Sequence, residues 1–397
     1  MHKRQLKKSS AAKPSPTHWS DYVREVKPPS RKRELLVGVL RGEGIGPEVT
    51  ASALQVLSAL ESVTDLRFQI DYGTAIGRDA ERGGKKVLPE EVIEFCGDIF
   101  ARGGAVLNGP GGGRYVYDLR RAFDLYCKLS PIKVAPELAK ANHLKPEHVQ
   151  GVDILMVREN ASGIYQGVWK VGKSKKSGRT ADHYFSYSEA EVNRILRPAA
   201  EIACTRRKEL TVVYKEAGVP AISELWRDCA IEVCKAHGVR CILLDIDHIS
   251  YRIIQHPREF DVVVAPNLFG DVLSDLGGAL LGSRGLCYAG SFGGKGEAVY
   301  STNHGAAYDL ARRNLANPVA HISSMAMMLR QSFGFDREAA LIEQAIPAVW
   351  QDGWRTPDLV EPGCKMIGTN EMAQRIADKV QVLGRAEAKA ARSRAAR

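Results

Sequence analysis

The chain has 397 residues, of which 44% are hydrophobic and 26% are charged, a composition typical of folded globular proteins. No segment approaches the roughly 18 uninterrupted apolar residues of a membrane span, which favours a soluble protein. The eight cysteines are scattered without a CxxC pair. They indicate reduced thiols and a cytoplasmic location rather than a disulfide or zinc framework.

The formal charge of +10 is concentrated at the two ends of the chain. Residues 1–33 carry a net charge of +8 and residues 385–397 carry +4, so the body between them carries −2. A nearly neutral body argues against a nucleic-acid-binding face. The composition of the two ends predicts disordered basic tails at residues 1–33 and 385–397.

From residue 34 onward, short apolar runs alternate with stretches of helical periodicity. The sequence predicts strands at 35–40, 104–108, 152–157, 210–214, 241–245 and 261–265. A helix opened by Pro47 should follow the first strand. Alternating strands and helices predict an α/β fold with a mostly parallel, covered sheet. Such sheets bind ligands at the carboxyl ends of their strands, so polar residues at those points are candidates for function.

The segment NLFGDVLSDLGG (267–278) places two aspartates about one helical turn apart, directly after the last predicted strand. Asp271 and Asp275 therefore share one face of the expected helix, where their like charges repel each other. The residues alone leave two interpretations open. The aspartates either complement the helix macrodipole near its N-terminus or bind a hard cation.

Four motifs follow one another along the chain: GEGIGPE (42–48), VRENASGIYQG (157–167), NLFGDVLSD (267–275) and NHGAAYDLARRNLANP (303–318). Together they resemble the signature set of the β-decarboxylating dehydrogenases, the family of isopropylmalate and isocitrate dehydrogenases. The resemblance covers about residues 34–384 and implies an isopropylmalate-dehydrogenase-like fold. It further implies a large cofactor-binding domain (34–125 and 282–384), a smaller dimerisation and metal–substrate domain (126–281), and an active-site cleft between them.

The resemblance also implies catalytic and metal-binding residues. Asp271 and Asp275 of one subunit, with Asp247 of the partner subunit, match the ligands of a divalent ion, and three carboxylates suit Mg²⁺ or Mn²⁺. Lys215 matches the family's base, and a lysine beside a metal ion can have a lowered pKa and relay the proton of the substrate hydroxyl. Tyr165 matches the tyrosine that protonates the substrate carbon after CO₂ leaves. Because Lys215 and Asp247 would complete the neighbouring site, a homodimer or higher oligomer with shared active sites is expected.

The substrate-binding residues only partly match the family. Arg120 and Arg158 match two of the three arginines that bind substrate carboxylates, but the third position holds Ser130. Ala217 likewise stands where the family carries an asparagine. Arg114 lies in the segment where family members distinguish substrate side chains. This altered anion clamp predicts a small anionic hydroxy acid other than the standard substrates.

The segment NHGAAYDLARRNLANP indicates the cofactor. His304, Gly305 and Asn317 match positions beside the adenosine of the nucleotide. Asp309 stands where NAD enzymes of the family carry aspartate and many NADP enzymes carry lysine. A carboxylate accepts hydrogen bonds from a free ribose hydroxyl and repels a 2′-phosphate, so NAD is predicted.

The function that the resemblance implies is the NAD-dependent and metal-dependent oxidative decarboxylation of a 3-substituted malate to a 2-oxo acid. Several alternatives remain open. Within the enzyme class, the substrate could be isopropylmalate or isocitrate itself, or the enzyme could be of the phosphonomethylmalate or tartrate type. Outside it, Ser130 and Ala217 suit a non-catalytic regulatory subunit of a heteromeric isocitrate dehydrogenase. No nucleic-acid or membrane partner is expected.

Overall fold

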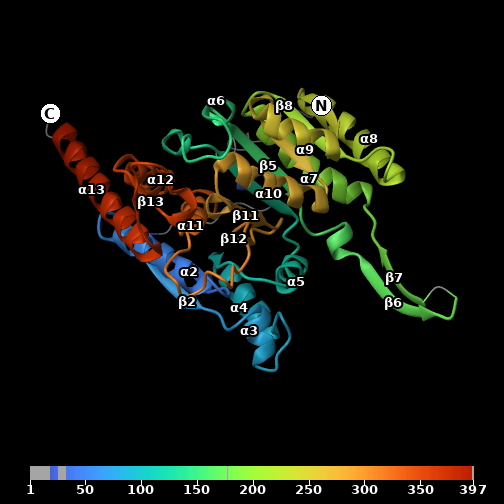
Figure 1. Cartoon of the computed structure of the whole chain (residues 1–397), viewed down its shortest axis with the longest axis horizontal. Helices are drawn as coiled ribbons and strands as arrows, with labels where there is room; N and C mark the ends of the chain where they lie inside the picture. Colours follow the sequence, from blue (N-terminus) through green and yellow to red (C-terminus); the bar gives the residue numbers. More distant parts are fainter. Residues whose placement is uncertain (1–17, 26–32, 177, 396–397) are drawn as a thin grey trace, which may run out of the picture.

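A computed structural model describes residues 18–25, 33–176 and 178–395. Within these residues, one ten-stranded sheet runs through the body of the molecule (Figure 1). Its strands, in the order in which they lie side by side, are β2 (Arg67–Tyr72), β1 (Glu34–Leu40), β3 (Ala105–Asn108), β12 (Ala298–Thr302), β11 (Tyr288–Phe292), β4 (Cys127–Lys133), β5 (Asp153–Glu159), β10 (Val262–Ala265), β8 (Glu209–Tyr214) and β9 (Arg240–Asp245). All six strands predicted from the sequence are present.

The sheet consists of two parallel groups that run in opposite directions. Strands β2, β1, β3 and β12 pair in parallel, and so do β5, β10, β8 and β9. Between the groups, β11 pairs antiparallel with β12 and β4, and β4 pairs antiparallel with β5. The predicted mostly parallel sheet is thus confirmed, with an antiparallel junction at its centre. The fully buried residues of β10 show the continuous apolar pattern of a strand covered on both faces.

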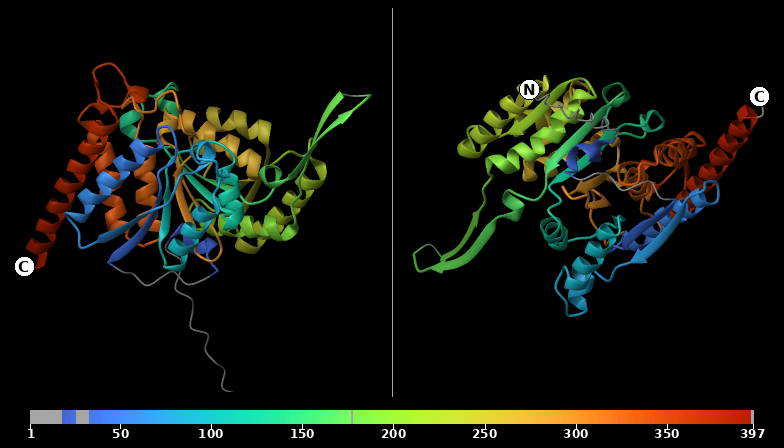
Figure 2. Two further views of the ribbon diagram at one scale, coloured as in Figure 1. Left: turned by 90° about the horizontal axis from the view of Figure 1, so that it is seen from below. Right: turned by 180° about the vertical axis from the view of Figure 1, so that it is seen from behind.

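Helices pack against both halves of this sheet (Figure 2). Helix α11 contacts β11 and β12, α4 contacts β1 and β3, α7 contacts β5, β8 and β10, and α10 contacts β4 and β5. The helices are α1 (Trp19–Val23), α2 (Gly46–Glu61), α3 (Gly77–Arg82), α4 (Glu90–Ala101), α5 (Tyr115–Ala122), α6 (Pro146–Val149), α7 (Glu189–Cys204), α8 (Pro220–His237), α9 (Ile246–Gln255), α10 (Asn267–Leu281), α11 (Val319–Gln331), α12 (Asp336–Gln351) and α13 (Thr369–Ala395). Of those in the described part of the chain, none has the length and apolarity needed to cross a membrane.

The turn from β1 into α2 contains the glycine-rich motif GEGIGPE. Gly44 has a positive φ of 58°, and a Cβ atom there would lie 2.1 Å from the carbonyl oxygen of Ala306. Glycine is therefore required at this position. The neighbouring N–H of Ile45 donates a hydrogen bond of 2.8 Å to the same oxygen, and Pro47 lies in the first turn of α2 as predicted. The motif thus holds the start of α2 against the segment that contains His304.

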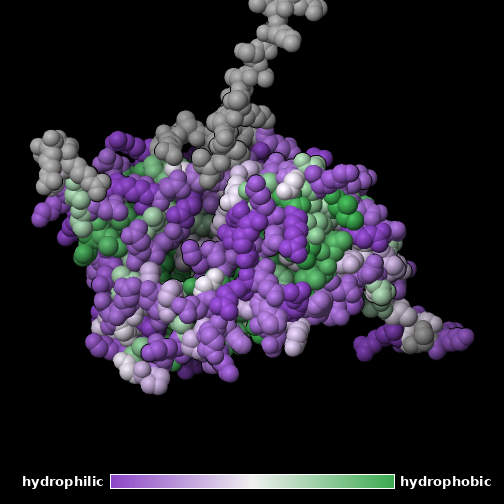
Figure 3. All heavy atoms as spheres, turned by 90° about the horizontal axis from the view of Figure 1, so that it is seen from above, coloured by the Kyte–Doolittle hydropathy of each residue, from purple (hydrophilic) through white to green (hydrophobic). Residues whose placement is uncertain are grey.

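A two-stranded arm projects away from the body (Figures 1 and 2). It consists of the antiparallel strands β6 (Val168–Ser174) and β7 (Gly178–Tyr184), which the sequence did not predict. Its apolar side chains that are more than half exposed are Val168, Trp169, Val171 and Tyr184. The face of the molecule shown in Figure 3 is largely hydrophilic, with apolar areas between the polar residues. An isolated hairpin is marginally stable in water, so this apolar arm needs a contact beyond its own two strands.

The predicted disordered tails are wrong in part. Within the N-terminal tail, helix α1 packs on the body: the Ser20 hydroxyl donates a 2.6 Å hydrogen bond to the carbonyl oxygen of Gln331, and Val23 is buried. Residues 1–17 and 26–32 lie outside the described part of the chain. At the other end, α13 continues to Ala395 because its alanine-rich, charged sequence has high helix propensity and extends an anchored helix. The predicted boundary between the two domains falls between β4 and β11, which are paired neighbours in the sheet, and that division stays a prediction.

Candidate active site

Arg158, near the end of β5, lies beside the start of α10, which follows β10. The two strands pair with Ala265 opposite Arg158, so the residues that follow β10 lie beside this arginine. Arg158 is almost fully buried, and its guanidinium donates hydrogen bonds of 2.8 and 3.1 Å to Oδ1 of Asn267. A further donor, Nη1, binds the carboxylate of Asp271. The arginine therefore supplies part of the compensating charge that the paired aspartates require.

Tyr165 binds the other oxygen of the Asp271 carboxylate. It lies in a short 3₁₀ turn (Ile164–Gln166), and its hydroxyl donates a hydrogen bond of 3.0 Å to Oδ2 of Asp271. Burial and the Asp271 charge raise the pKa of Tyr165, which keeps the phenol protonated. Burial opposes ionisation of Asp271, yet the charges of Arg158 and Lys128 hold its pKa below the usual value. Arg158 and Tyr165 of the 157–167 motif thus meet at the carboxylate of Asp271, which belongs to the 267–275 motif.

The two arginines of the α5 region have different surroundings. Arg120 is buried, and burial together with the Arg158 charge lowers its pKa, while the Asp271 charge acts in the opposite direction. It therefore lies within the electrostatic reach of the Tyr165–Asp271–Arg158 cluster. Arg114 instead donates a 2.8 Å hydrogen bond from Nη1 to the backbone oxygen of Tyr165, and its guanidinium lies 4.9 Å from the ring centre of Trp169. This arginine connects the base of the arm to the turn that carries Tyr165.

Lys215 and Asp247 form a separate pair. Strands β8 and β9 pair with Tyr214 opposite Asp245, so the residues that follow each strand are neighbours. The Lys215 ammonium donates a 2.7 Å hydrogen bond to Oδ1 of Asp247 and lies 3.5 Å from Asp245. The hydrogen bond to Asp247 raises the pKa of Lys215 in the single subunit, and the lowering expected beside a metal ion stays a prediction.

Asp275 lies one turn beyond Asp271 and contacts a different arginine. Its carboxylate oxygens lie 3.0 and 3.2 Å from Nη2 of Arg284. Within residues 18–25, 33–176 and 178–395, no group of three His, Cys, Asp or Glu side chains is arranged to hold a metal ion. The carboxylates of α10 fit Mg²⁺ or Mn²⁺ in their chemistry, since these ions prefer oxygen ligands. That a third carboxylate comes from a second copy of the chain stays a prediction.

A cavity of about 420 Å³ lies beside this region, within the size range of small-molecule sites. Its lining includes His304, Gly305 and Asn317, three of the four residues predicted to bind the nucleotide, together with Ile45 from the glycine-rich turn. Asp309 is exposed and does not line it. Burial lowers the pKa of His304, which favours the neutral imidazole.

Sequence reasoning did not single out two residues that shape this cavity. Arg284 lines the cavity and also pairs with Asp275, so it joins the candidate nucleotide site to the candidate metal site. Asp358 accepts a 3.0 Å hydrogen bond from Asn317. Arg284 lies nine residues from Asp275 and Asp358 lies 41 residues from Asn317, and neither Arg284 nor Asp358 stands out by spacing or composition.

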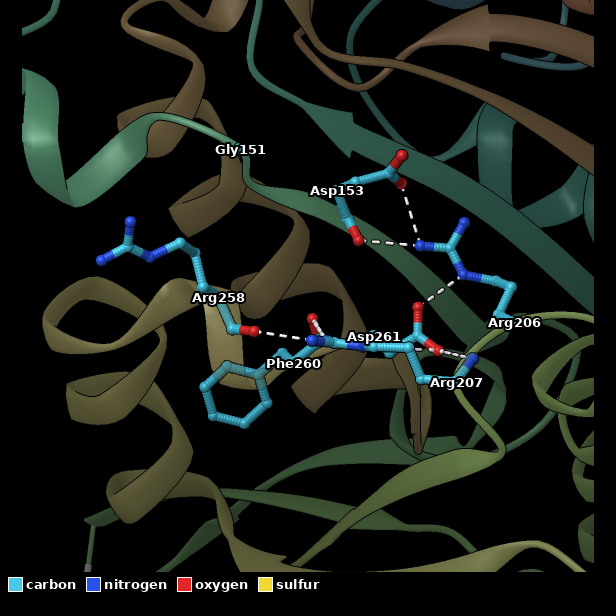
Figure 4. A pocket seen from close by; sticks show the side chains of 7 residues that line it. All are labelled: Gly151, Asp153, Arg206, Arg207, Arg258, Phe260 and Asp261. Carbon is cyan, nitrogen blue, oxygen red and sulfur yellow. Dashed lines mark hydrogen bonds and ion pairs between the residues drawn. The ribbon is translucent and has the colours of Figure 1, made fainter.

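A second cavity, of about 320 Å³, lies at the amino ends of β5 and β10, away from the residues above. Arg206 points toward Asp153 and Asp261, whereas the side chain of Arg258 points away from them (Figure 4). The hydrogen bond between Arg206 and Asp261 is 2.6 Å, and Asp261 also accepts one of 2.8 Å from the backbone N–H of Arg207. The charged groups that line this cavity are hydrogen-bonded to one another. We therefore interpret them as structural contacts that join neighbouring strands.

Glu159, the residue after Arg158, provides a test of the buried charge in this region. Its carboxylate accepts hydrogen bonds of 3.0 Å from the N–H groups of Ala161 and Ser162, and burial raises its pKa from 4.5 to about 7. Because the folded state binds this proton more tightly than the unfolded state, wild-type stability falls as the pH rises from about 4.5 to about 7.

Glu159→Gln keeps an acceptor oxygen but has no proton to lose. We expect its free energy of unfolding to rise relative to that of wild type by up to about 3 kcal/mol between pH 5 and pH 8. Urea unfolding of both proteins at the two pH values measures the difference. A difference in free energy of unfolding that is the same at both pH values would contradict the raised pKa of Glu159.

The fold is α/β with a large, mostly parallel sheet, and the candidate site residues lie near the ends of its strands. The family model described as isocitrate/isopropylmalate dehydrogenase matches residues 36–376, and the chain belongs to this family of β-decarboxylating dehydrogenases. The 3-isopropylmalate dehydrogenase of Carboxydothermus hydrogenoformans is 38% identical over 356 residues, covering 86% of this chain and 94% of that protein. That of Aquifex aeolicus is 37% identical over 357 residues, covering 87% and 97%. The crystal structure of isocitrate dehydrogenase from Methylococcus capsulatus superposes with a TM-score of 0.78 at 30% identity, covering 87% of this chain and 99% of that one.

Proposed function

We propose that this chain is an NAD-dependent and divalent-metal-dependent dehydrogenase that oxidises and decarboxylates a 3-substituted malate to a 2-oxo acid. The observation that carries the proposal is the meeting of Tyr165, Arg158 and Asp271 at the ends of β5 and β10. A protonated phenol, a buried guanidinium and a carboxylate in contact provide a proton donor, an anion-binding group and a metal ligand within one site.

Each residue has a role in this reaction. Asp271 and Asp275, with Asp247 of the partner subunit, would hold the ion, and Arg158 would bind a substrate carboxylate. A bound Mg²⁺ or Mn²⁺ would stabilise negative charge on the substrate oxygens, and NAD would accept the hydride. Lys215 would take up the proton of the C2 hydroxyl as a neutral amine, which requires that it separate from Asp247 and lose its own extra proton first.

Proton return to C3 is the role of Tyr165. Its hydroxyl is the donor in the hydrogen bond to Asp271, and its raised pKa keeps the proton in place until CO₂ has left. The same raised pKa excludes this phenol as the base of the first step at neutral pH. The acid and base roles therefore belong to different residues, Tyr165 and Lys215.

The proposed enzyme is a homodimer with shared sites. Asp247 lies on α9 and Asp271 on α10, and these two helices contact each other. Tyr251 of α9 is 66% exposed and Val272 of α10 is 47% exposed, so both helices present apolar surface. A two-fold contact through α9 and α10 would bring Asp247 of the partner subunit toward Asp271, and the apolar arm would gain the contact that it needs.

The substrate is proposed to be a non-standard malate because Ser130 replaces an arginine of the anion clamp. The same residue, with Ala217, favours a second candidate function, that of a regulatory subunit of a heteromeric isocitrate dehydrogenase. Lys215, Tyr165 and the three aspartates argue for catalysis. We place the protein in the cytoplasm on its family relationship and on its eight free cysteines.

The proposal is tested by incubating the full-length protein with Mn²⁺ and a panel of malates that differ at C3, with NAD and with NADP. We expect the formation of NADH and CO₂ with at least one non-standard malate. Failure of every malate, isopropylmalate and isocitrate included, would favour the regulatory subunit. Turnover with NADP alone would contradict the role of Asp309, because a carboxylate repels the 2′-phosphate.

A further inference from the structure

Lys128 is a buried cation that faces the candidate active site. It lies on β4 directly opposite Arg158 of β5, so the two side chains share one face of the sheet with Cβ atoms about 5 Å apart. The residue is only 4% exposed. Among the described residues, no hydrogen bond or ion pair to its ammonium is found, which is costly for a charge so deeply buried.

The charged groups around Lys128 do not neutralise the positive charge of its ammonium. Burial and the charges of Arg120 and Arg158 lower the pKa of Lys128 well below its usual value, against the attraction of Asp271 and Asp275. Each of these carboxylates already contacts a guanidinium, Asp271 that of Arg158 and Asp275 that of Arg284. The site therefore contains more buried positive charge than its own acids neutralise, which is the condition for binding an anion.

Ser130 lies on the same face of β4, because residues two apart in a strand point the same way. It is 1% exposed, and its hydroxyl is buried without a hydrogen-bond partner. This serine occupies the position where the family carries its third substrate-binding arginine. The strand has thus lost a guanidinium at residue 130 and carries an unpaired ammonium two residues earlier.

We propose that Lys128 replaces the missing arginine: its ammonium, together with Arg120, binds one carboxylate of the substrate, and the Ser130 hydroxyl donates a hydrogen bond to the same ligand. This inference rests on the proposed function and deepens it, since it assigns a specificity-determining residue. An ammonium is a point charge on a flexible stem, whereas a guanidinium is a planar fork that binds two oxygens at once. The site is accordingly suited to a dicarboxylate whose anchored carboxylate lies nearer the amino end of β4 than an arginine at residue 130 would place it.

The test compares the full-length wild-type protein with Lys128→Met, using D-malate and 3-isopropylmalate with Mn²⁺ as probes. Loss of a charge-assisted hydrogen bond should raise KM about 10-fold to 100-fold, with a smaller change in kcat. The rise in melting temperature that these dicarboxylates cause should shrink in parallel. The ligand-free melting temperature of the variant should not fall, because a buried unpaired charge has been removed.

Two further variants make the result specific to this site. Lys133→Met makes the same substitution on the same strand, but Lys133 is 75% exposed, and we expect no change in KM. Adding Ser130→Arg to Lys128→Met should restore part of the lost affinity, because it returns a cation to this face of β4.

An unchanged KM and an unchanged ligand-induced rise in melting temperature in Lys128→Met would overturn the role of Lys128 and leave the proposed function standing. Reduced ligand-free stability with unchanged KM would also overturn it, since that pattern indicates a structural lysine. If the wild type turns over none of the malates, the proposed function fails instead. The rise in melting temperature with each dicarboxylate then still decides whether Lys128 binds the anion.

Discussion

Two inactive variants of this chain, Lys215→Met and Asp271→Asn, should recover about a quarter of the wild-type rate when they are assembled into mixed dimers. Lys215 contacts Asp247 and, in the described chain, makes no hydrogen bond or ion pair with Asp271. If each site combines Lys215 of one subunit with Asp271 of the other, a mixed dimer contains one intact site and one doubly damaged site. Half of the dimers formed at random are mixed, which gives the expected fraction.

The measurement is the rate of NADH formation by the unseparated random mixture, and mixed dimers purified from it through two different affinity tags should reach about half of the wild-type rate. Each variant alone should be slower than wild type by about 10²-fold to 10⁴-fold, the range for loss of a general acid or base. A matched control combines Lys215→Met with Asp247→Asn. These two residues would be donated together, so no mixed dimer contains an intact site. Recovery in this control, or none in the first mixture, would rule out the shared arrangement.

Replacing Arg158 by methionine should lower the free energy of unfolding by about 3 kcal/mol or more and abolish substrate binding. The methionine fills part of the volume but leaves Oδ1 of the buried Asn267 without its two donors. It also leaves Asp271 with Tyr165 as its remaining hydrogen-bond donor among the described residues. Urea unfolding measures the stability, and the rise in melting temperature with D-malate and Mn²⁺ measures binding.

Arg227→Met serves as the control for this change. Arg227 forms its ion pairs at the surface of α8, where such pairs contribute at most about 1 kcal/mol. The loss of stability in Arg158→Lys should lie between the losses in Arg158→Met and Arg227→Met. The charge remains in this variant, while the planar guanidinium that contacts Asn267 and Asp271 is lost. An Arg158→Met protein that unfolds at the wild-type urea concentration would contradict the proposed bridge between β5 and α10.

The sequence predicted six of the ten strands of the large sheet, because buried parallel strands are continuous apolar runs, as in DVVVA at β10, and it missed β2, β4, β11 and β12. It also indicated that polar residues after such strands are candidates for function, and Arg158 and Asp271 are among them. The arm was missed because β6, VWKVGKS, is exposed along almost its entire length and has no buried face to produce a regular alternation.

Contacts that depend on tertiary geometry escaped prediction for a different reason. The pairing of Arg284 with Asp275 depends on how α10 ends and on where the following 3₁₀ turn begins, which local pattern does not determine. In the sequence, Lys128 is only one of several basic residues near Ser130. Its position opposite Arg158 follows from the antiparallel register of β4 and β5, at a junction that the alternating pattern of strands and helices does not predict.

The short helix α1 has a practical consequence for anyone who trims the protein before crystallisation. Its composition invites deletion up to residue 33, yet the backbone N–H of Ser20 donates a 3.0 Å hydrogen bond to the Gln331 side chain and the oxygen of Val23 accepts one from the Tyr126 hydroxyl. A shortened polypeptide would leave the Tyr126 donor unsatisfied and open an apolar hollow over α11. Such a molecule would be prone to aggregate for reasons unrelated to its chemistry.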